Sequence, residues 1–302
     1  MKPLAQRMTL LLWAELALLS AIWGGSFVFG RVAMAYLPPL TTALARVTLA
    51  AAALWLFVLL TRRATAPVRP FMLALLAMGL INNAIPFFLI LWGQKEIGSG
   101  LASVINALTP VWTLIFARFA ARDELLGWGR VFGIMLGLAG VAVLMSGEIG
   151  AGLSAPLAAQ LAVLGATVSY GAAAVFGRRF RQIDPVLVAT GQLSGSSLLL
   201  FLPAMLIETP WTLPTPPAIA LWSVASLALL CTAFAYFLFF RILSRAGATN
   251  VSLVTMLVPV SAILLGAVFL GETLTWPELG GMALIATGLA AIDGRLVAIL
   301  RR

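Results

Sequence analysis

The chain has 302 residues, of which 62% are hydrophobic and 10% are charged. Soluble proteins carry about 25% charged residues, so this composition excludes a soluble domain and indicates an integral membrane protein. Histidine is absent and Cys231 is the single cysteine, which excludes an intrachain disulfide and a histidine-ligated metal site. We therefore expect no metal and no cofactor. We interpret the net charge of +9 as a signal of membrane topology and expect no nucleic-acid partner.

Ten apolar segments follow one another, and each is close to the length of about 20 residues that a helix needs to cross a bilayer. The sequence therefore predicts an all-α integral membrane protein with ten transmembrane helices in contact with lipid. The connections are short and marked by proline or glycine, which leaves no room for a soluble domain. The segments cover residues 12–32, 40–60, 71–92, 97–119, 128–146, 156–178, 185–206, 217–241, 247–270 and 277–297.

The basic residues are unevenly shared between the two ends of these helices. If the N-terminus is cytoplasmic, 16 of the 19 lysines and arginines lie at cytoplasmic ends. Arg31 and Lys95 lie at outer ends, and Arg46 lies within the second segment. Basic residues accumulate on the cytoplasmic side of membrane proteins, so we expect both termini to be cytoplasmic.

The run 98–110 is repeated at 247–259, at an offset of 149 residues. Each run ends on a proline, whose ring displaces the backbone carbonyl four residues earlier. That carbonyl belongs to Asn106 in the first run and to Thr255 in the second. Such groups need a partner inside a membrane, so we expect this face of each helix to point into protein or a watery cavity.

The repeat extends through the chain, which we divide into residues 1–150 and 151–302. Each part holds five helices, and because five is odd the second part crosses the membrane in the opposite direction. Inverted repeats of this kind are typical of secondary transporters, with the substrate site near the midplane where the halves meet. The aligned pairs include Trp23–Tyr170, Pro39–Pro185, Arg46–Gln192, Phe87–Tyr236, Glu124–Glu272 and Gly140–Gly288.

This pattern resembles a known family of membrane carriers. Each half has an aromatic–glycine start, a proline in its fourth helix, and a glutamate followed by a glycine-rich helix. These features are similar to the paired EamA domains of the drug/metabolite transporter superfamily, and within it to YddG-type exporters of aromatic amino acids. The resemblance implies a bacterial inner-membrane carrier that works by alternating access and moves amino acids, metabolites or drugs, usually outward.

Polar residues at mid-depth are our first candidates for a substrate site. Asn82, Asn106 and Thr255 each lie four residues before a proline, and we expect the third, fourth, eighth and ninth helices to line a shared cavity. The alternative is that these side chains bond neighbouring helices. The full set of polar candidates is Asn82, Asn83, Ser103, Asn106, Thr109, Ser252 and Thr255.

Aromatic and basic residues inside the segments complete the candidate site. Trp23, Tyr170 and Tyr236 lie well inside their segments, where a large apolar substrate would stack on their rings. Packing against lipid or against the core is the alternative. Arg46 is the only basic residue well inside a segment. It either extends to the outer interface or faces the cavity and attracts a carboxylate.

No acidic residue lies at mid-depth in the sequence. We expect Glu15 and Asp293 to be solvated or paired with arginines such as Arg7 and Arg295. Glu124 and Glu272 are expected near helix starts, where a carboxylate complements the helix dipole. Glycines 133 and 137 form a GxxxG pattern, which favours close contact between helices.

These features predict an exporter of amino acids or related small amphipathic metabolites, for which a monomer is plausible. Because no titratable group lies in the pathway, we expect facilitated diffusion, with proton coupling through Glu15 as the alternative. A proton-coupled exporter of cationic drugs would need a buried carboxylate. An intramembrane enzyme would need paired acids, a serine–lysine pair or metal ligands, so we expect no enzymatic activity. A channel stays open as an alternative, although inverted repeats with broken helices favour a carrier.

Overall fold

The computed structural model describes residues 9–120, 128–149, 155–246, 251 and 253–293. Throughout these ranges the regular structure is helical, with no strand. Seven segments are long and apolar enough to cross a membrane, and three shorter apolar helices cover Val131–Val143, Leu257–Leu270 and Leu279–Ala291. The expected all-α membrane protein of ten helices is confirmed.

The first half contains five segments, of which the third and fourth are interrupted. The third segment consists of a 3₁₀ helix, an α-helix, a π-helix and a second α-helix in direct succession. The elements are α1 (Leu10–Met34), α2 (Pro39–Leu60), η1 (Ala66–Phe71), α3 (Met72–Gly79), η2 (Leu80–Ala84), α4 (Ile85–Gly93), α5 (Ser99–Asn106), α6 (Thr109–Ala120) and α7 (Trp128–Ile149).

The second half also contains five segments, and its third one again includes a π-helix. The elements are α8 (Ala155–Phe176), η3 (Gly177–Phe180), α9 (Pro185–Pro203), η4 (Ala204–Glu208), η5 (Pro210–Thr212), α10 (Ala218–Ala225), η6 (Ser226–Phe234), α11 (Ala235–Ala246), α13 (Val254–Leu270) and α14 (Trp276–Asp293).

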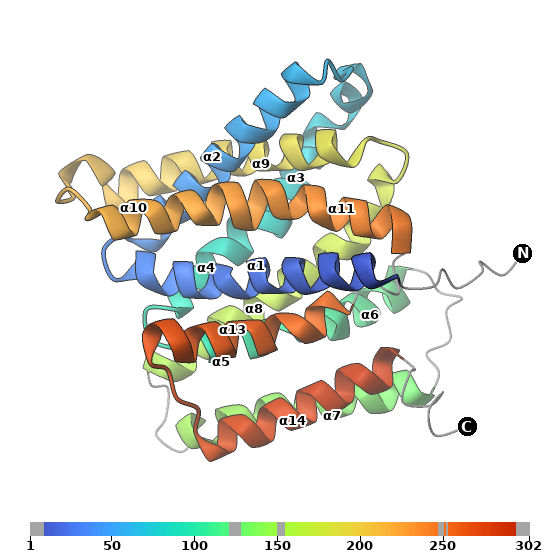
Figure 1. Ribbon diagram of the computed structural model, residues 1–302, viewed down its shortest axis with the longest axis vertical. Helices are drawn as coiled ribbons and strands as arrows, with labels where there is room; N and C mark the ends of the chain where they lie inside the picture. The colour runs from blue at the N-terminus through green and yellow to red at the C-terminus, as the bar shows by residue number, and fades with distance from the viewer. Residues whose placement is uncertain (1–8, 121–127, 150–154, 247–250, 252, 294–302) are drawn as a thin grey trace, which may run out of the picture.

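The helices lie roughly along one direction, and α1 begins where α14 ends (Figure 1). We call this end of the bundle, which includes Leu10, Arg63 and Asp184, the terminal end. The other end includes Met34 and Glu208, and we call it the opposite end. An even number of crossings brings the first and last helices back to the same end.

Each half packs its first helix against the fourth segment of the other half. Helix α1 packs against α13, and α8 packs against α6. A Cβ on Gly24 of α1 would lie 2.6 Å from the Ser261 Cβ, and one on Gly171 of α8 would lie 2.5 Å from the Trp112 Cβ. Gly24 and Gly171 are repeat partners, so the same small residue permits the same close crossing twice. The two halves are therefore intertwined.

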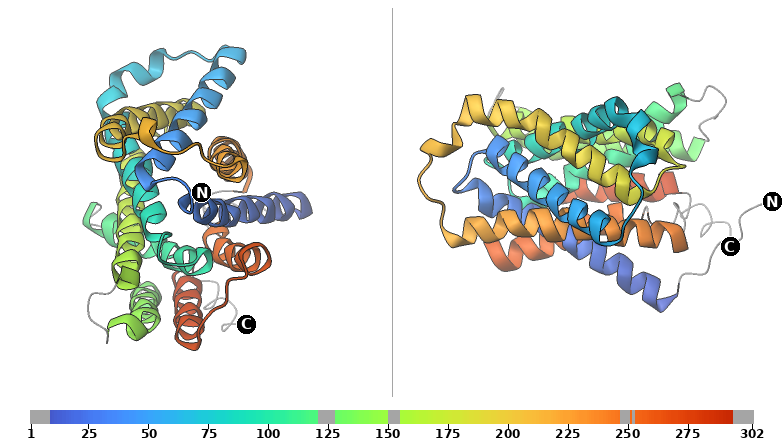
Figure 2. Two further views of the ribbon diagram at one scale, coloured as in Figure 1. Left: turned by 90° about the vertical axis from the view of Figure 1, so that its left-hand side faces the viewer. Right: turned by 90° about the horizontal axis from the view of Figure 1, so that it is seen from above.

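Helices α7 and α14 pack against each other along one edge of the bundle, as Figures 1 and 2 show. A Cβ on Gly288 would lie 2.7 Å from the Gly133 carbonyl oxygen, and one on Gly140 would lie 2.8 Å from that of Gly281. The backbones touch at these points because no side chain separates them. The close helix contact predicted from the glycine pattern of the fifth segment is confirmed.

The expected helix breaks occur beside two of the prolines. The π-helix η2 directly precedes the α-helical turn that contains Pro86, and α5 ends at Asn106, four residues before Pro110. The Asn106 carbonyl, which loses its helical donor to the proline, accepts a hydrogen bond from Thr109 Oγ1 at 2.9 Å. Thr109 therefore repairs the break that Pro110 creates.

At the opposite end, two glutamates cap helices that are distant in sequence. Glu272 accepts hydrogen bonds from the backbone N–H of Ser99 at 2.7 Å and of Gly100 at 3.1 Å, at the start of α5. Glu208 accepts from the backbone N–H of Leu40 at 2.9 Å and of Thr41 at 2.6 Å, at the start of α2. Glu272 thus complements a helix dipole as expected, but the helix is in the other half of the chain.

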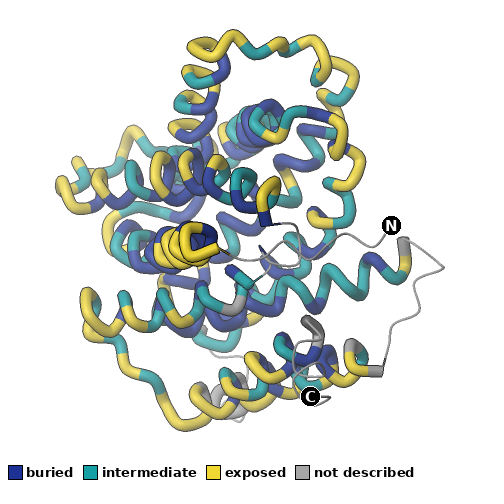
Figure 3. The backbone as a smooth tube through the Cα atoms, turned by 45° about the vertical axis from the view of Figure 1, so that its right-hand side comes forward, coloured by how far each residue is buried: buried dark blue, intermediate teal, exposed yellow. Residues whose placement is uncertain are grey.

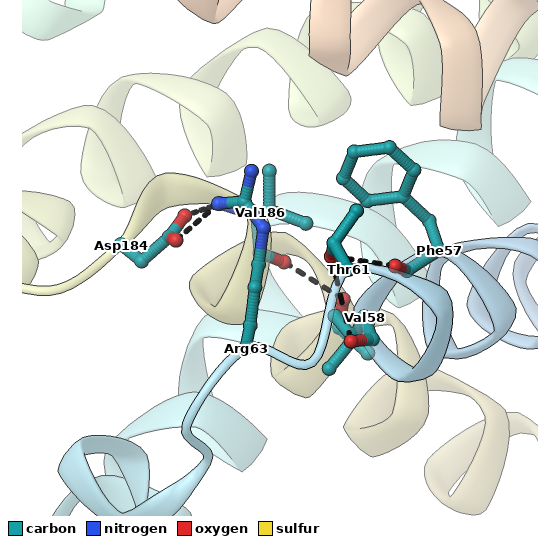
Figure 4. A network of polar contacts seen from close by, with 7 residues as sticks. Phe57, Val58, Thr61, Arg63, Asp184 and Val186 are labelled. Carbon is teal, nitrogen blue, oxygen red and sulfur yellow. Dashed lines mark hydrogen bonds and ion pairs between the residues drawn. The ribbon is translucent and has the colours of Figure 1, made fainter.

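At the terminal end, ion pairs join helices from the two halves. Arg63, just beyond α2, pairs with Asp184, which also accepts a hydrogen bond from the Val186 N–H at the start of α9 (Figure 4). Glu15 lies 2.7 Å from Arg241 of α11. Glu15 is thus paired with an arginine, as one of our two expectations had it, and the arginine comes from α11, which packs against α1; Arg7 lies outside the described residues. Glu124 and the Asp293 side chain lie outside the described residues.

Figure 3 shows exposed positions along the outward faces of the bundle, and many of the exposed residues are large and apolar. Leu73 is 83% exposed and Val268 is 76% exposed, for example. A soluble protein does not expose so many large apolar residues, whereas a bilayer solvates them. The arrangement is that of a multi-pass membrane protein.

Candidate functional site

Polar side chains from both halves meet in the interior, where the second and third segments of each half pack together. We call this group the central polar cluster. Its seven members come from α2, η2, α9, η6 and α11, and five of them are buried. They are Arg46, Asn82, Asn83, Gln192, Ser196, Thr232 and Tyr236.

The two asparagines of η2 differ in how completely they are bonded. Asn83 is fully buried; its Nδ2 donates to Ser196 Oγ at 3.2 Å, and its Oδ1 accepts from the Tyr236 hydroxyl at 3.0 Å. Asn82 is half-buried; its Nδ2 donates to Gln192 Oε1 at 3.2 Å and makes a longer contact of 3.5 Å with the Tyr236 hydroxyl. Both asparagines therefore join helices of the two halves, and Asn82 differs in its lower burial and in its longer contact with Tyr236.

Arg46 provides the positive charge of the cluster. Its Nε donates to Thr232 Oγ1 at 2.9 Å, and its guanidinium carbon lies 3.8 Å from the centroid of the Phe87 ring. Only 9% of the residue is exposed. We left open whether Arg46 extends to the interface or faces the interior, and the structure places it in the interior, bonded to the other half of the chain.

The π-helices η2 and η6 occupy matching positions in the two halves, since residues 80–84 align with 229–233 at the offset of 149. A π-helix widens the turn and shifts the side chains that follow, and such segments are frequent at functional sites. Here η2 contains Asn82 and Asn83, and η6 contains Thr232. Thr232 Oγ1 donates to the carbonyl five residues earlier, at Leu227, which leaves its lone pair to accept from Arg46.

An apolar cavity of about 350 Å³ lies beside the cluster, between α2, α9 and the eighth segment, and it is partly open to the outside, where its lining residues Leu229, Phe234 and Phe237 are exposed. Its lining includes Ala53, Phe57, Tyr236, Phe237 and Phe240, and Tyr236 is its link to the cluster. Sites for small molecules are mostly apolar pockets of about 300–1,000 Å³ with a few placed polar groups. The cavity and the cluster together have that character.

The structure brings together four of the residues predicted from the sequence: Arg46, Asn82, Asn83 and Tyr236. Tyr170 lies near this group, packed against the cores on both sides of it. Trp23 packs on Phe239, with 5.6 Å between the ring centroids.

Of the four segments expected to line a cavity, the third, fourth and ninth contribute no residue to this one. Ser103 donates to the Gly100 carbonyl of its own helix, and Asn106 Oδ1 is buried with no partner in the described part of the chain. Thr255 lies in α13, whose path continues unbroken through Pro259, and it makes an interaction of its own. Ser252 lies outside the described residues. The cavity described here is thus lined differently from the one we expected.

Sequence reasoning missed Gln192, Ser196, Thr232 and Phe87 as members or neighbours of the cluster. The repeat alignment contained the signal for three of them. It pairs Arg46 with Gln192, Phe87 with Tyr236, and Asn83 with Thr232. Residues at equivalent positions of an inverted repeat converge where the halves meet, so a candidate in one half also indicates its partner.

The acidic side chains that the structure describes lie away from the cluster. Glu208 and Glu272 cap helices, Glu15 and Asp184 pair with arginines, and Glu96 is exposed beyond α4. No group of three or more potential metal ligands occurs among the described residues. The positive charge and the amide groups of the cluster can bond a polar or anionic organic group.

Comparison with known proteins identifies the family. The sequence pattern of the EamA-like transporter family matches residues 11–146 and again 157–292. The "Uncharacterized inner membrane transporter YedA" of Escherichia coli K12 is 31% identical, over 91% of this chain and 89% of its own. The "Uncharacterized transporter YvbV" of Bacillus subtilis is 28% identical, over 97% of this chain and 94% of its own.

Two further similarities concern function and fold. The "Probable amino-acid metabolite efflux pump" of Salmonella typhimurium is 28% identical, over 90% of this chain and 91% of its own. A crystal structure that is 21% identical in sequence covers 99% of this chain and all of its own with a TM-score of 0.65, so the two share a fold. The two family matches together span most of the sequence, and the chain belongs to the EamA-like transporter family, whose members are membrane transporters of the drug/metabolite superfamily.

Proposed function

We propose that the protein exports small amphipathic metabolites, in particular amino acids with apolar or aromatic side chains, by alternating access. The observation that carries this proposal is the central polar cluster, which both halves build and which adjoins an apolar cavity. In carriers made of inverted repeats, the substrate binds where the halves meet, and their relative movement exposes it to either side. The efflux pump among the relatives supports an amino-acid substrate.

The charges of the described site favour this substrate over a cationic drug. A binding site for an organic cation is expected to present a buried carboxylate, whereas the buried charge in the cluster is Arg46. None of the described residues that line the cavity is acidic. The site favours a neutral or anionic head group with an apolar tail.

The proposed membrane is the bacterial inner membrane, with the terminal end in the cytoplasm. Arg62, Arg63, Arg241 and Arg245 lie at the terminal end, and basic residues concentrate on the cytoplasmic side. The proposed energetics is uniport down the substrate gradient, because Glu15 is already paired with Arg241. Small-molecule substrate and lipid are the partners of this mechanism, and a single chain contains the whole site.

Counterflow in proteoliposomes tests the proposal. Purified protein is reconstituted, the vesicles are loaded with unlabelled phenylalanine or leucine, and the uptake of the labelled compound is followed. A carrier gives saturable uptake that the internal substrate accelerates. A channel gives uptake that internal substrate does not accelerate, and uptake equal to that of protein-free vesicles for every amino acid contradicts the proposal.

A further inference from the structure

Arg46 and Glu15 are the two charged side chains that are buried in the described part of the chain. Glu15 lies near the terminal end, 2.7 Å from Arg241. Arg46 has no such counter-ion: no ion pair joins it to any described residue. A buried charge is costly unless an opposite charge or a set of hydrogen bonds compensates it, so the missing anion requires an explanation.

Of its five N–H donors, the guanidinium of Arg46 uses one in bonds to the described residues. The Nε–H bonds to Thr232, and the face of the group lies on the Phe87 ring. The two terminal amino groups have no hydrogen-bond partner among the described residues, yet neither is among the completely buried unsatisfied atoms. Thr232 and Phe87 thus hold the guanidinium in place, while its two terminal amino groups stay available as donors. This geometry binds a carboxylate through two parallel hydrogen bonds.

The cavity lies farther along α2, and Arg46 is not one of its lining residues. Arg46 and Ala53 are seven residues apart, which places them on one face of the helix and about 10 Å apart along its axis. Ala53 and Phe57 line the cavity. On the eighth segment Thr232, which bonds Arg46, lies one turn before Tyr236, which lines the cavity. An apolar tail that leaves Arg46 along this face of α2 reaches the cavity at Ala53 and Tyr236.

An ammonium group finds no comparable partner in this region. The described acidic residues cap helices, pair with arginines or lie at the surface, and none lines the cavity. The positive charge of Arg46 also repels a cation placed next to it. The amide oxygens of the cluster are neutral acceptors, so they contribute less to binding a cation than a carboxylate does.

We infer that the site recognises an organic monocarboxylate with an apolar tail through Arg46, and that an α-amino group on the ligand is not required. The substrate class then includes aromatic and branched aliphatic carboxylic acids as well as the corresponding amino acids, and excludes their amides and amines. This inference rests on the proposed transport function for its biological meaning. It concerns binding, so it is testable without transport.

Four ligands that differ in one group each provide the test: phenylalanine, 3-phenylpropionate, phenylalanine amide and phenethylamine. Binding to the purified protein is measured by titration calorimetry and thermal shift near pH 7.5. We expect the two carboxylates to bind within about threefold of each other, and the amide and amine at least about tenfold more weakly, because they lose the charge-assisted pair. The inference is overturned if the amine or the amide binds as tightly as the two carboxylates, or if none of the four ligands binds.

Variants of Arg46 give a second, independent measurement. Arg46→Gln is expected to weaken the binding of both carboxylates at least tenfold and to leave the amide and amine unchanged. The affinity of Arg46→Lys for the carboxylates is expected to lie between those of the unaltered protein and of Arg46→Gln, because an ammonium group retains the positive charge but lacks the planar set of N–H donors. Arg181→Gln, which removes an exposed arginine just beyond η3, is the matched control and is expected to bind as the unaltered protein does. If Arg46→Gln fails to fold, the four-ligand comparison on the unaltered protein decides alone.

Transport of the same compounds separates this inference from the proposed function. If the carboxylates bind through Arg46 but counterflow is absent, the binding inference stands and the export proposal fails. If phenylalanine is transported while the amide and the amine compete for its uptake as well as 3-phenylpropionate does, the export proposal stands and the carboxylate inference fails.

Discussion

Asn82 and Asn83 are neighbours in sequence, but their side chains differ in burial and in hydrogen bonding. Asn83 is fully buried and has both ends of its amide bonded, whereas Asn82 is half-buried and makes contacts of 3.2 and 3.5 Å. A hydrogen bond between helices in a membrane contributes about 0.6–2 kcal/mol. We therefore expect the hydrogen bonds of Asn83 to contribute more to stability, and we propose Asn82 as the asparagine that contacts the substrate.

Replacement of the two asparagines by leucine tests this difference. We expect Asn83→Leu to lower the melting temperature clearly, because Ser196 and Tyr236 lose their partner in a buried site. Asn82→Leu is expected to reduce counterflow several-fold with a smaller thermal effect. Gln182→Leu, which changes an exposed amide, controls for the substitution itself. The assignment is wrong if Asn82→Leu unfolds the protein more readily than Asn83→Leu does.

At the scale of the elements, helix ends and π-helices define the site. The π-helices η2 and η6 turn polar side chains toward the junction of the two halves. Glu208 and Glu272 attach the starts of α2 and α5 to segments of the other half. A buried helix start leaves backbone N–H groups unsatisfied unless a side chain accepts from them, and carboxylates do so while complementing the dipole.

Glu272→Gln is expected to destabilise the protein by about 1 kcal/mol, in the range of about 0.5–2 kcal/mol for lost caps. The amide keeps one acceptor oxygen but presents an NH₂ group to the backbone donors of Ser99 and Gly100. Thermal unfolding in detergent measures the change. Glu96→Gln, an exposed glutamate also beyond the end of a helix, is expected to have no effect. Equal melting temperatures for the two variants refute the capping role.

At the scale of the whole molecule, none of the described acidic side chains lies in the site, and this bears on whether transport is coupled to protons. A proton-coupled carrier needs a titratable group where the substrate is bound. Glu15 lies at the terminal end of α1, with Arg241 at 2.7 Å and Arg245 at 3.9 Å. It is thus engaged by arginines of α11, away from the cluster, and we expect movement of the substrate down its own gradient.

Flux measured with and without an imposed pH gradient, for the unaltered protein and for Glu15→Gln, decides this point. Uniport predicts equal flux in all four conditions. Concentrative transport that a proton gradient drives, and that Glu15→Gln abolishes, would establish proton coupling. Since Glu15 also joins α1 to α11, the melting temperature of the variant is recorded alongside, and its flux is normalised to folded protein.

The sequence by itself determined the class of protein, the ten helices, the two repeats and the helix breaks beside Pro86 and Pro110, whereas the break expected at Pro259 does not occur. Each of these follows from local chemistry: apolar length, the distribution of arginines, and the missing N–H of proline. It also selected Arg46, Asn82, Asn83 and Tyr236, because polar groups inside an apolar segment are costly and need a reason.

Only the tertiary structure decided which of these residues meet. We expected a cavity lined by the third, fourth, eighth and ninth segments, and of these only the eighth lines the cavity described here. The cavity lies instead between the second, seventh and eighth segments. Likewise, the arginines that pair with Glu15 come from a helix more than 200 residues away in the chain. Contacts of this kind depend on the packing of intertwined halves, which the local pattern of residues does not specify.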